Sequence, residues 1–211
     1  MDWYRQIAWS EQIESEFERR LARSRGQRSE YLRIQAVTLA DQDLSDLAPV
    51  AIKLAKRQLE LSATGISAAQ MWATVAKGCV TLGQFDEAMD AYRHAVRLEG
   101  QTPNVRGHHY LDFAWHVVTN SVVALYPEVL AAIEQNLQQR DLIFPANQYR
   151  YFAALALIAA DSGDRAKAST LAKNALASIE TSQGPFWRLP LLGRVKSRAD
   201  PIRTRLEQLA R

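Results

Sequence analysis

The chain has 211 residues, 47% of them hydrophobic and 23% charged, with a formal net charge of +3, which suits one large domain or two small ones with a substantial core. Its only cysteine, Cys79, excludes an intramolecular disulfide and a cysteine-based zinc site. Alanine and leucine are abundant, runs of β-branched residues are few, and glycines and prolines lie mostly between periodic segments, which together favour an all-α chain.

The predicted elements are helices that mostly come in pairs. The first begins after Ser10, a residue type favoured at the N-cap, and is expected to stop at Gly26. Asp200 is expected to cap the last helix, with Pro201 in its first turn. The apolar periodicity between them predicts further helices, which cover residues 29–40, 47–61, 68–82, 86–98, 108–123, 127–139, 149–161 and 165–179.

Two segments between these helices are predicted to be linkers. The first, EGQTPNVRG at 99–107, carries glycines and a proline, and the second, IFPANQ at 143–148, carries a proline. Both residue types interrupt a helix, because proline lacks a backbone N–H and glycine loses the most conformational freedom on folding. Near the C-terminus, the segment from Phe186 to Val195 is expected to be irregular and to cover one end of the fold.

Two of the predicted hairpins share one pattern. In both, a turn glycine is followed five residues later by alanine, at Gly83–Ala88 and at Gly163–Ala168. An aromatic residue leads the first helix of each, Trp72 in one and Phe152 in the other. The second helices carry small or aromatic residues at helical spacing, namely Ala88, Tyr92 and Ala95, and Ala168, Ala172 and Ala175. These residues resemble the tetratricopeptide repeat (TPR) family, whose unit is a helix–turn–helix of about 34 residues.

Two further hairpins follow the pattern less closely, with Gln35 and Phe113 in the leading positions. The four leading positions are separated by 37, 41 and 39 residues, so the turns or linkers are longer than in the family. The resemblance implies an all-α fold, a right-handed superhelix of about four TPR-like helical hairpins with extra N- and C-terminal helices. A non-repetitive helical bundle is the alternative. The predicted single domain spans 1–211, with a capping helix in 1–27, hairpins in 28–182 and a tail and helix in 183–211.

No motif of a familiar enzyme class is found. The sequence has no Gly-rich phosphate loop, no G-x-S-x-G elbow and no H-E-x-x-H pair. His108, Asp112 and His116 share a helical face, but they span about 12 Å, which is too long for one metal ion to reach both ends. Cys79 falls on the expected buried face of its helix, which indicates a structural role. We therefore expect a non-catalytic protein with no cofactor and no metal.

The resemblance places a binding surface on the first helix of each hairpin, because these helices line a concave groove that holds a peptide in the family. Arginines there could bind carboxylates through two parallel hydrogen bonds. Ala73 and Ala114 stand where the family's clamp for C-terminal carboxylates needs polar residues, so chaperone tails are not expected partners. Four residues occupy equivalent second positions of these helices, Arg33, Gln70, Leu111 and Arg150. Lys77 lies two turns along its helix from Gln70, and Asn147 lies just before the last such helix, so the predicted partner-binding groove consists of these six residues.

The function expected from this reading is a protein- or peptide-binding adaptor or scaffold, present as a monomer or homodimer. The chain has no apolar run near the ~18 residues that would span a membrane and no secretory signal at its start, so we expect a cytoplasmic protein without membrane contact. The alternative is a nucleic-acid-associated regulator that binds through basic segments near the ends, at 19–33 and 185–211. A helical-repeat enzyme with an unfamiliar site is a third hypothesis.

Overall fold

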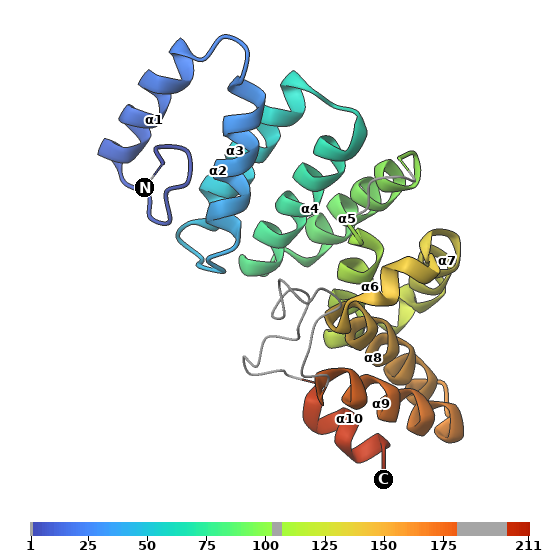
Figure 1. The fold of residues 1–211 in the computed structure, drawn as a ribbon. Helices are drawn as coiled ribbons and strands as arrows, with labels where there is room; N and C mark the ends of the chain where they lie inside the picture. The colour runs from blue at the N-terminus through green and yellow to red at the C-terminus, as the bar shows by residue number, and fades with distance from the viewer. Residues whose placement is uncertain (1, 103–106, 181–201) are drawn as a thin grey trace. The chain divides into compact units, whose positions relative to one another are not determined.

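In a computed structural model the chain is described over residues 2–102, 107–180 and 202–211, and every regular element in these ranges is helical (Figure 1). The prediction of an all-α chain is therefore confirmed. The elements are α1 (Glu11–Arg23), α2 (Arg28–Ala40), α3 (Ala48–Leu61), α4 (Gly65–Thr81), α5 (Phe85–Gly100), α6 (His109–Thr119), the 3₁₀ turn η1 (Val123–Leu125), α7 (Tyr126–Asn136), the 3₁₀ turn η2 (Gln139–Ile143), α8 (Pro145–Asp161), α9 (Arg165–Glu180) and α10 (Arg203–Leu209).

Helix α1 begins where the sequence predicts. Ser10 is extended, and its hydroxyl oxygen accepts a hydrogen bond from the backbone N–H of Ile13 at 3.3 Å, which confirms the N-cap. The helix ends at Arg23, before the predicted stop at Gly26. The Ser24 hydroxyl donates to a carbonyl of the last turn, so a side chain bonds the exposed end of the helix before the glycine is reached.

Several boundaries differ from the prediction. Helix α8 begins at Pro145, inside the segment 143–148 that was expected to be a linker. Proline is favourable at the first helical position, because the N–H that it lacks would have no partner there. Helix α4 begins at Gly65, three residues before Ala68, and α6 ends at Thr119, short of the predicted end at 123. The predicted cap at Asp200 and Pro201 and the predicted cover at 186–195 lie outside the described residues.

The helices form four hairpins, α2–α3, α4–α5, α6–α7 and α8–α9, and each turn contains one residue with a positive φ angle. These residues are Asp43, Gly83, Ser121 and Gly163, with φ angles of 55°, 71°, 54° and 84°. They follow one another at intervals of 40, 38 and 42 residues. This periodic backbone feature is compatible with a helical repeat, and it includes two positions that are not glycine.

The turns also share their hydrogen bonds. In three of them the left-handed residue donates to the carbonyl three positions back, and the next residue donates to the carbonyl five positions back, as in the Schellman motif. The two bonds are 3.0 and 2.9 Å at Gly83, 3.1 and 3.1 Å at Ser121, and 3.0 and 2.9 Å at Gly163. The same mechanism therefore ends the first helix in three hairpins.

The chain divides into two compact units, Met1–His109 and Tyr110–Arg211. In the first, the hairpins α2–α3 and α4–α5 lie side by side and α1 packs on α2 (Figure 1). In the second, α8 and α9 pack along each other and α10 covers both. Each unit has its own core of fully buried side chains, Phe17, Leu21, Leu32, Leu39, Leu54, Met71 and Met89 in the first and Tyr110, Phe113, Leu157 and Leu206 in the second.

Within each unit, polar contacts join helices that are two apart along the chain, namely α1 to the second helix of the first hairpin, and the first helices of consecutive hairpins to each other. They connect α1 with α3, α2 with α4, and α6 with α8, between residues 36 to 39 positions apart, which is close to the interval between the turns. These helices therefore lie next to each other at equivalent heights. The pairs are Glu14–Lys53, Glu18–Arg57, Arg33–Gln70, Asp41–Lys77 and Asp112–Arg150.

A buried carboxylate orders the chain that follows α5. Glu99 is completely buried, and its two oxygens accept hydrogen bonds from the backbone N–H groups of Gly107, His108 and His109 at 2.6, 2.6 and 2.8 Å. A Cβ atom at Gly107 would lie 2.3 Å from Nε2 of His109. A side chain at Gly107 would therefore have to displace the His109 ring.

Candidate partner-binding surface

In the first unit the structure brings together three of the predicted groove residues. Arg33 on α2 donates from Nη1 to Oε1 of Gln70 on α4 at 2.6 Å. Two turns along α4, the Lys77 ammonium contacts Asp41 at 3.0 Å and Asp43 at 3.2 Å. Polar contacts thus join α2 and α4 at two positions that are two turns apart along α4. We call this surface the α2–α4 face, and it consists of Glu30, Arg33, Asp41, Asp43, Gln70 and Lys77.

The guanidinium of Arg33 is already occupied within this face. Its Nε and Nη2 atoms donate to both carboxylate oxygens of Glu30, at 2.9 and 2.5 Å, while Nη1 is bonded to Gln70. The hydrogen bonds between Arg33 and Glu30 lower the pKa of Glu30 and raise that of Arg33. A partner carboxylate would have to displace Glu30, so this arginine is not a vacant anion site.

The other three predicted groove residues belong to the second unit. Arg150 on α8 forms an ion pair with Asp112 on α6 at 2.7 Å. The side-chain amide of Asn147 donates to the carbonyl of Asp141 at 2.9 Å. Leu111 exposes only 1% of its surface and belongs to the core. Leu111 therefore does not line a surface groove, and the prediction that the other five residues share one groove stays a prediction, because the two units are described separately.

The candidate metal ligands and the cysteine are engaged in packing or in ion pairs. Asp112, the middle member of the histidine–aspartate series, is bonded to Arg150. Within the described ranges, no group of three or more His, Cys, Asp or Glu side chains could hold a metal ion. Cys79 is 5% exposed, and burial raises the pKa of its thiol, which disfavours the reactive thiolate.

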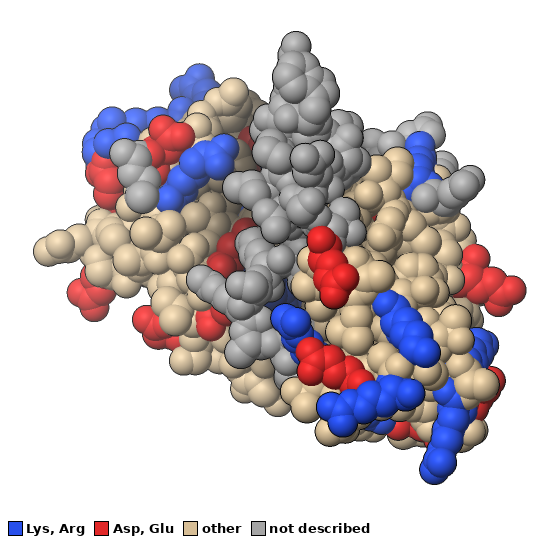
Figure 2. Space-filling view, turned by 60° about the horizontal axis from the view of Figure 1, so that its bottom comes forward, with Lys and Arg blue, Asp and Glu red and all other residues tan. Residues whose placement is uncertain are grey.

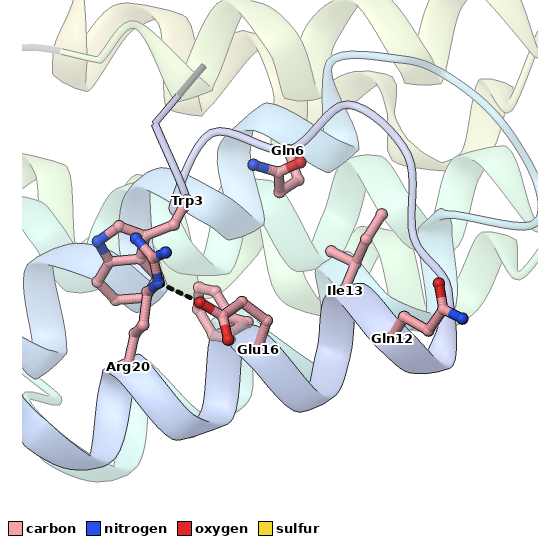
Figure 3. Close-up of a pocket in the computed structure, with 7 residues that line it drawn as sticks. Trp3, Gln6, Gln12, Ile13, Glu16 and Arg20 are labelled. Carbon is pink, nitrogen blue, oxygen red and sulfur yellow. Dashed lines mark hydrogen bonds and ion pairs between the residues drawn. The ribbon is translucent and has the colours of Figure 1, made fainter.

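A cavity that the sequence does not indicate lies between the N-terminal segment and α1. Trp3 and Gln6 enter it from the segment, and α1 supplies the opposite wall (Figure 3). Its volume is about 320 Å³, and the ion pair between Glu16 and Arg20 lies on one side. The lining residues are Trp3, Gln6, Gln12, Ile13, Glu16, Phe17 and Arg20.

The N-terminal segment is held in place by one buried glutamine and by aromatic packing. Gln35 on α2 is fully buried, accepts from the backbone N–H of Gln6 at 2.9 Å and donates to the carbonyl of the same residue at 2.8 Å. The Trp3 ring lies 4.8 Å from that of Tyr31 and 5.4 Å from that of Phe17, measured between centroids. The segment is therefore held against both α1 and α2.

A second cavity lies at the turn between α1 and α2, next to the end of α3. It has a volume of about 410 Å³ and is lined by Ala22, Arg25, Gly26, Arg28, Ser29 and Leu61. The sequence shows these arginines only as part of the basic segment 19–33. Their association with Leu61 depends on the packing of α3 beside this turn, so no local pattern could have indicated it.

The structure reduces the basic character of the segment 19–33. Arg19 and Arg20 form ion pairs with Glu16, and Arg33 is bonded to Glu30. On the face seen in Figure 2, basic side chains lie beside acidic ones and do not form one continuous field. Most of the other basic segment, 185–211, lies outside the described residues.

No family model, curated protein or solved structure matches the chain. Among the described helices, none is long and apolar enough to cross a membrane. The first unit presents three candidate binding surfaces, which are the α2–α4 face, the cavity behind the N-terminal segment and the cavity at the α1–α2 turn.

Proposed function

We propose that the protein is a non-catalytic adaptor that binds a protein or peptide segment on the first helices of TPR-like repeats. The observation that carries this proposal is the α2–α4 face. There, the first helices of two consecutive hairpins present polar side chains at matching heights, linked as Arg33–Gln70 and Asp41–Lys77. The regular interval between the four left-handed turns supports equivalence of the hairpins.

The charges of this face define the kind of partner. Three acidic and two basic side chains lie on it, and the side chains of Asp41 and Asp43 remain 64% and 56% exposed. Ion pairs at such exposure contribute little to stability, so they exchange for intermolecular pairs at low cost. We therefore expect a polar segment that carries both signs of charge, rather than a strongly acidic one.

Affinity capture from the native cell with the immobilised full chain tests the proposal. We expect the wild type to retain a specific partner and the double variant Arg33→Gln, Lys77→Gln to lose it. The matched control is Lys167→Gln, Lys173→Gln, which removes the same charge from exposed positions of α9 and should keep the partner. Repeated capture of no specific partner, or equal capture by all three proteins, would reject the α2–α4 face as the binding surface.

A further inference from the structure

We propose that the cavity at the α1–α2 turn binds the carboxylate of an acidic peptide segment, with an apolar side chain of the same segment against Leu61. The proposal rests on the proposed function in that the ligand is a peptide, but it uses a surface separate from the α2–α4 face. Two arginines, a hydroxyl group and an exposed leucine line the cavity, which holds about 410 Å³, within the usual range of ligand pockets.

The two arginines of this cavity, like Arg23, differ from the paired arginines of the same unit. Among the described residues, neither Arg25 nor Arg28 forms an ion pair or a side-chain hydrogen bond. By contrast, the guanidinium groups of Arg33 and Arg57 are bonded to Glu30 and Glu18. The carboxylate nearest to the cavity along α2 is therefore already taken, and two unneutralised guanidinium groups face an open space. Guanidinium groups bind carboxylates through paired hydrogen bonds.

Ser29 supplies an oriented donor to the same space. Gln58 on α3 is 1% exposed and donates from its amide nitrogen to the hydroxyl oxygen of Ser29 at 3.0 Å. Because the hydroxyl oxygen accepts this bond, its hydrogen is left to donate to another group. Ser29 lines the cavity, so this hydrogen adds to the arginine donors. All the polar side chains that line the cavity can donate, which fits an anionic oxygen.

The exposed side chain of Leu61 favours an anionic ligand that also carries an apolar group. It is the last residue of α3, and 52% of its surface is exposed at the edge of the cavity. A free phosphate or a nucleic-acid backbone would leave this apolar surface in water, whereas an acidic peptide can place a neighbouring apolar side chain on it. The combination favours a segment in which glutamate or aspartate adjoins leucine or a similar residue.

The probe for this site is a fluorescein-labelled peptide that alternates leucine and glutamate, titrated with the full chain at 20 mM NaCl and followed by fluorescence anisotropy. In the double variant Arg25→Glu, Arg28→Glu we expect the Kd to rise by at least about tenfold, because both guanidinium contacts are replaced by repulsion. The control variant Lys167→Glu, Lys173→Glu changes the net charge equally and should bind like the wild type. Leu61→Ser should weaken the leucine–glutamate probe but not an all-glutamate peptide.

Other results would overturn either the site or the kind of ligand. Absence of binding by the wild type, or equal weakening in the control variant, overturns the site. Tighter binding of a six-nucleotide oligothymidine than of the peptide, with the same loss in the arginine variant, overturns the peptide in favour of nucleic acid. The variant Arg33→Gln, Lys77→Gln should leave probe binding unchanged, so the α2–α4 face can fail its own test without affecting this one. Circular dichroism confirms that each variant is folded.

Discussion

At the scale of single residues, the left-handed backbone at the hairpin turns decides which residue types fit there. Gly83 and Gly163 have positive φ angles and no atom within 4 Å of where a Cβ would lie, so their requirement for glycine is purely conformational. Asp43 and Ser121 adopt the same conformation with a side chain. Aspartate tolerates the left-handed region better than serine does, because its side chain can hydrogen-bond locally. Ser121 is therefore the strained member of the set.

Replacing Ser121 with glycine should stabilise the protein. The substitution relieves a left-handed serine at a cost of some chain entropy, and we expect a gain of roughly 0.5–1 kcal/mol in the free energy of unfolding. Gly163→Ala should lose about 1 kcal/mol for the same reason. Urea denaturation measures both. As a control, Ser15→Gly in the interior of α1 should destabilise, and a destabilising effect of Ser121→Gly would contradict the strain.

A second residue-scale prediction concerns the contact between α3 and α4. A Cβ at Gly78 would lie 2.7 Å from Cγ1 and 3.0 Å from Cδ1 of Ile52. Gly78→Ala should therefore destabilise by about 1 kcal/mol, since overpacking of ~1–3 kcal/mol exceeds the gain in helix propensity of up to ~1 kcal/mol. In an Ile52→Ala background both clashing atoms are absent, and the same change should become stabilising. Urea denaturation of the four proteins gives the coupling, and an unchanged sign would show that the helices separate freely.

At the scale of elements, the sequence predicts the existence of the helices better than their ends. The periodicity of apolar residues indicated every helix from α1 to α9, because each buries one face. The ends depend on competing local bonds. Helix α1 stops at Arg23 through Ser24, before the glycine, and α8 starts at Pro145 because proline begins a helix as readily as it interrupts one. The turn at Ser121 was not predicted, because serine gives no signal of a left-handed backbone.

Tyr126 links two elements of the second unit in a way that depends on pH. It begins α7, is buried, and donates to Asp161 at the end of α8 at 2.6 Å. Burial raises the pKa of the Tyr126 phenol well above its ordinary value, and the hydrogen bond to Asp161 raises it further. The folded state thus favours the protonated phenol, and this contribution is fully present below the unfolded-state pKa of about 10 and is lost as the pH rises beyond it.

Tyr126→Phe should separate these effects. At pH 7 the variant loses the bond to Asp161 and should be less stable by about 1 kcal/mol. Above pH 10 the wild type should lose stability faster than the variant, because the exposed Tyr126 phenol of the unfolded state ionises while the buried phenol of the folded state stays protonated. Urea denaturation at intervals from pH 7 to 11 follows both proteins. Curves that remain parallel over this range would contradict the raised pKa.

At the scale of the whole molecule, the candidate binding surface was harder to predict than the fold. Arg33 and Gln70 were expected on one face and do lie together, because equivalent positions in stacked hairpins become neighbours. The hydrogen bonds of Arg33 to Glu30 and to Gln70 leave its guanidinium occupied. The bond to Gln70 depends on the distance between two helices, which the pattern of a single helix does not indicate. Leu111 shows the limit of transfer by position, because in this degenerate hairpin the equivalent side chain is buried.

If the hairpins are equivalent, the same substitution in each unit should have a similar effect on stability. Ala88 and Ala168 each lie five residues after a left-handed glycine and are completely buried, one in α5 and the other in α9. Leucine at either position should overpack the contact between the two helices of the hairpin and destabilise by about 1–3 kcal/mol. The exposed Ala166 in α9 is the control, and Ala166→Leu should change the stability by less than ~0.5 kcal/mol.

Thermal and urea denaturation of the three variants test this equivalence. Similar costs for Ala88→Leu and Ala168→Leu are expected because the two turns have the same hydrogen bonds, to within 0.1 Å in the pair of bonds that define the motif. The two alanines then occupy the same place relative to the turn in each hairpin, and both are completely buried. A large loss of stability at one position and none at the other would contradict the equivalence. The hairpins would then share the backbone conformation of the turn but not the packing of their helices.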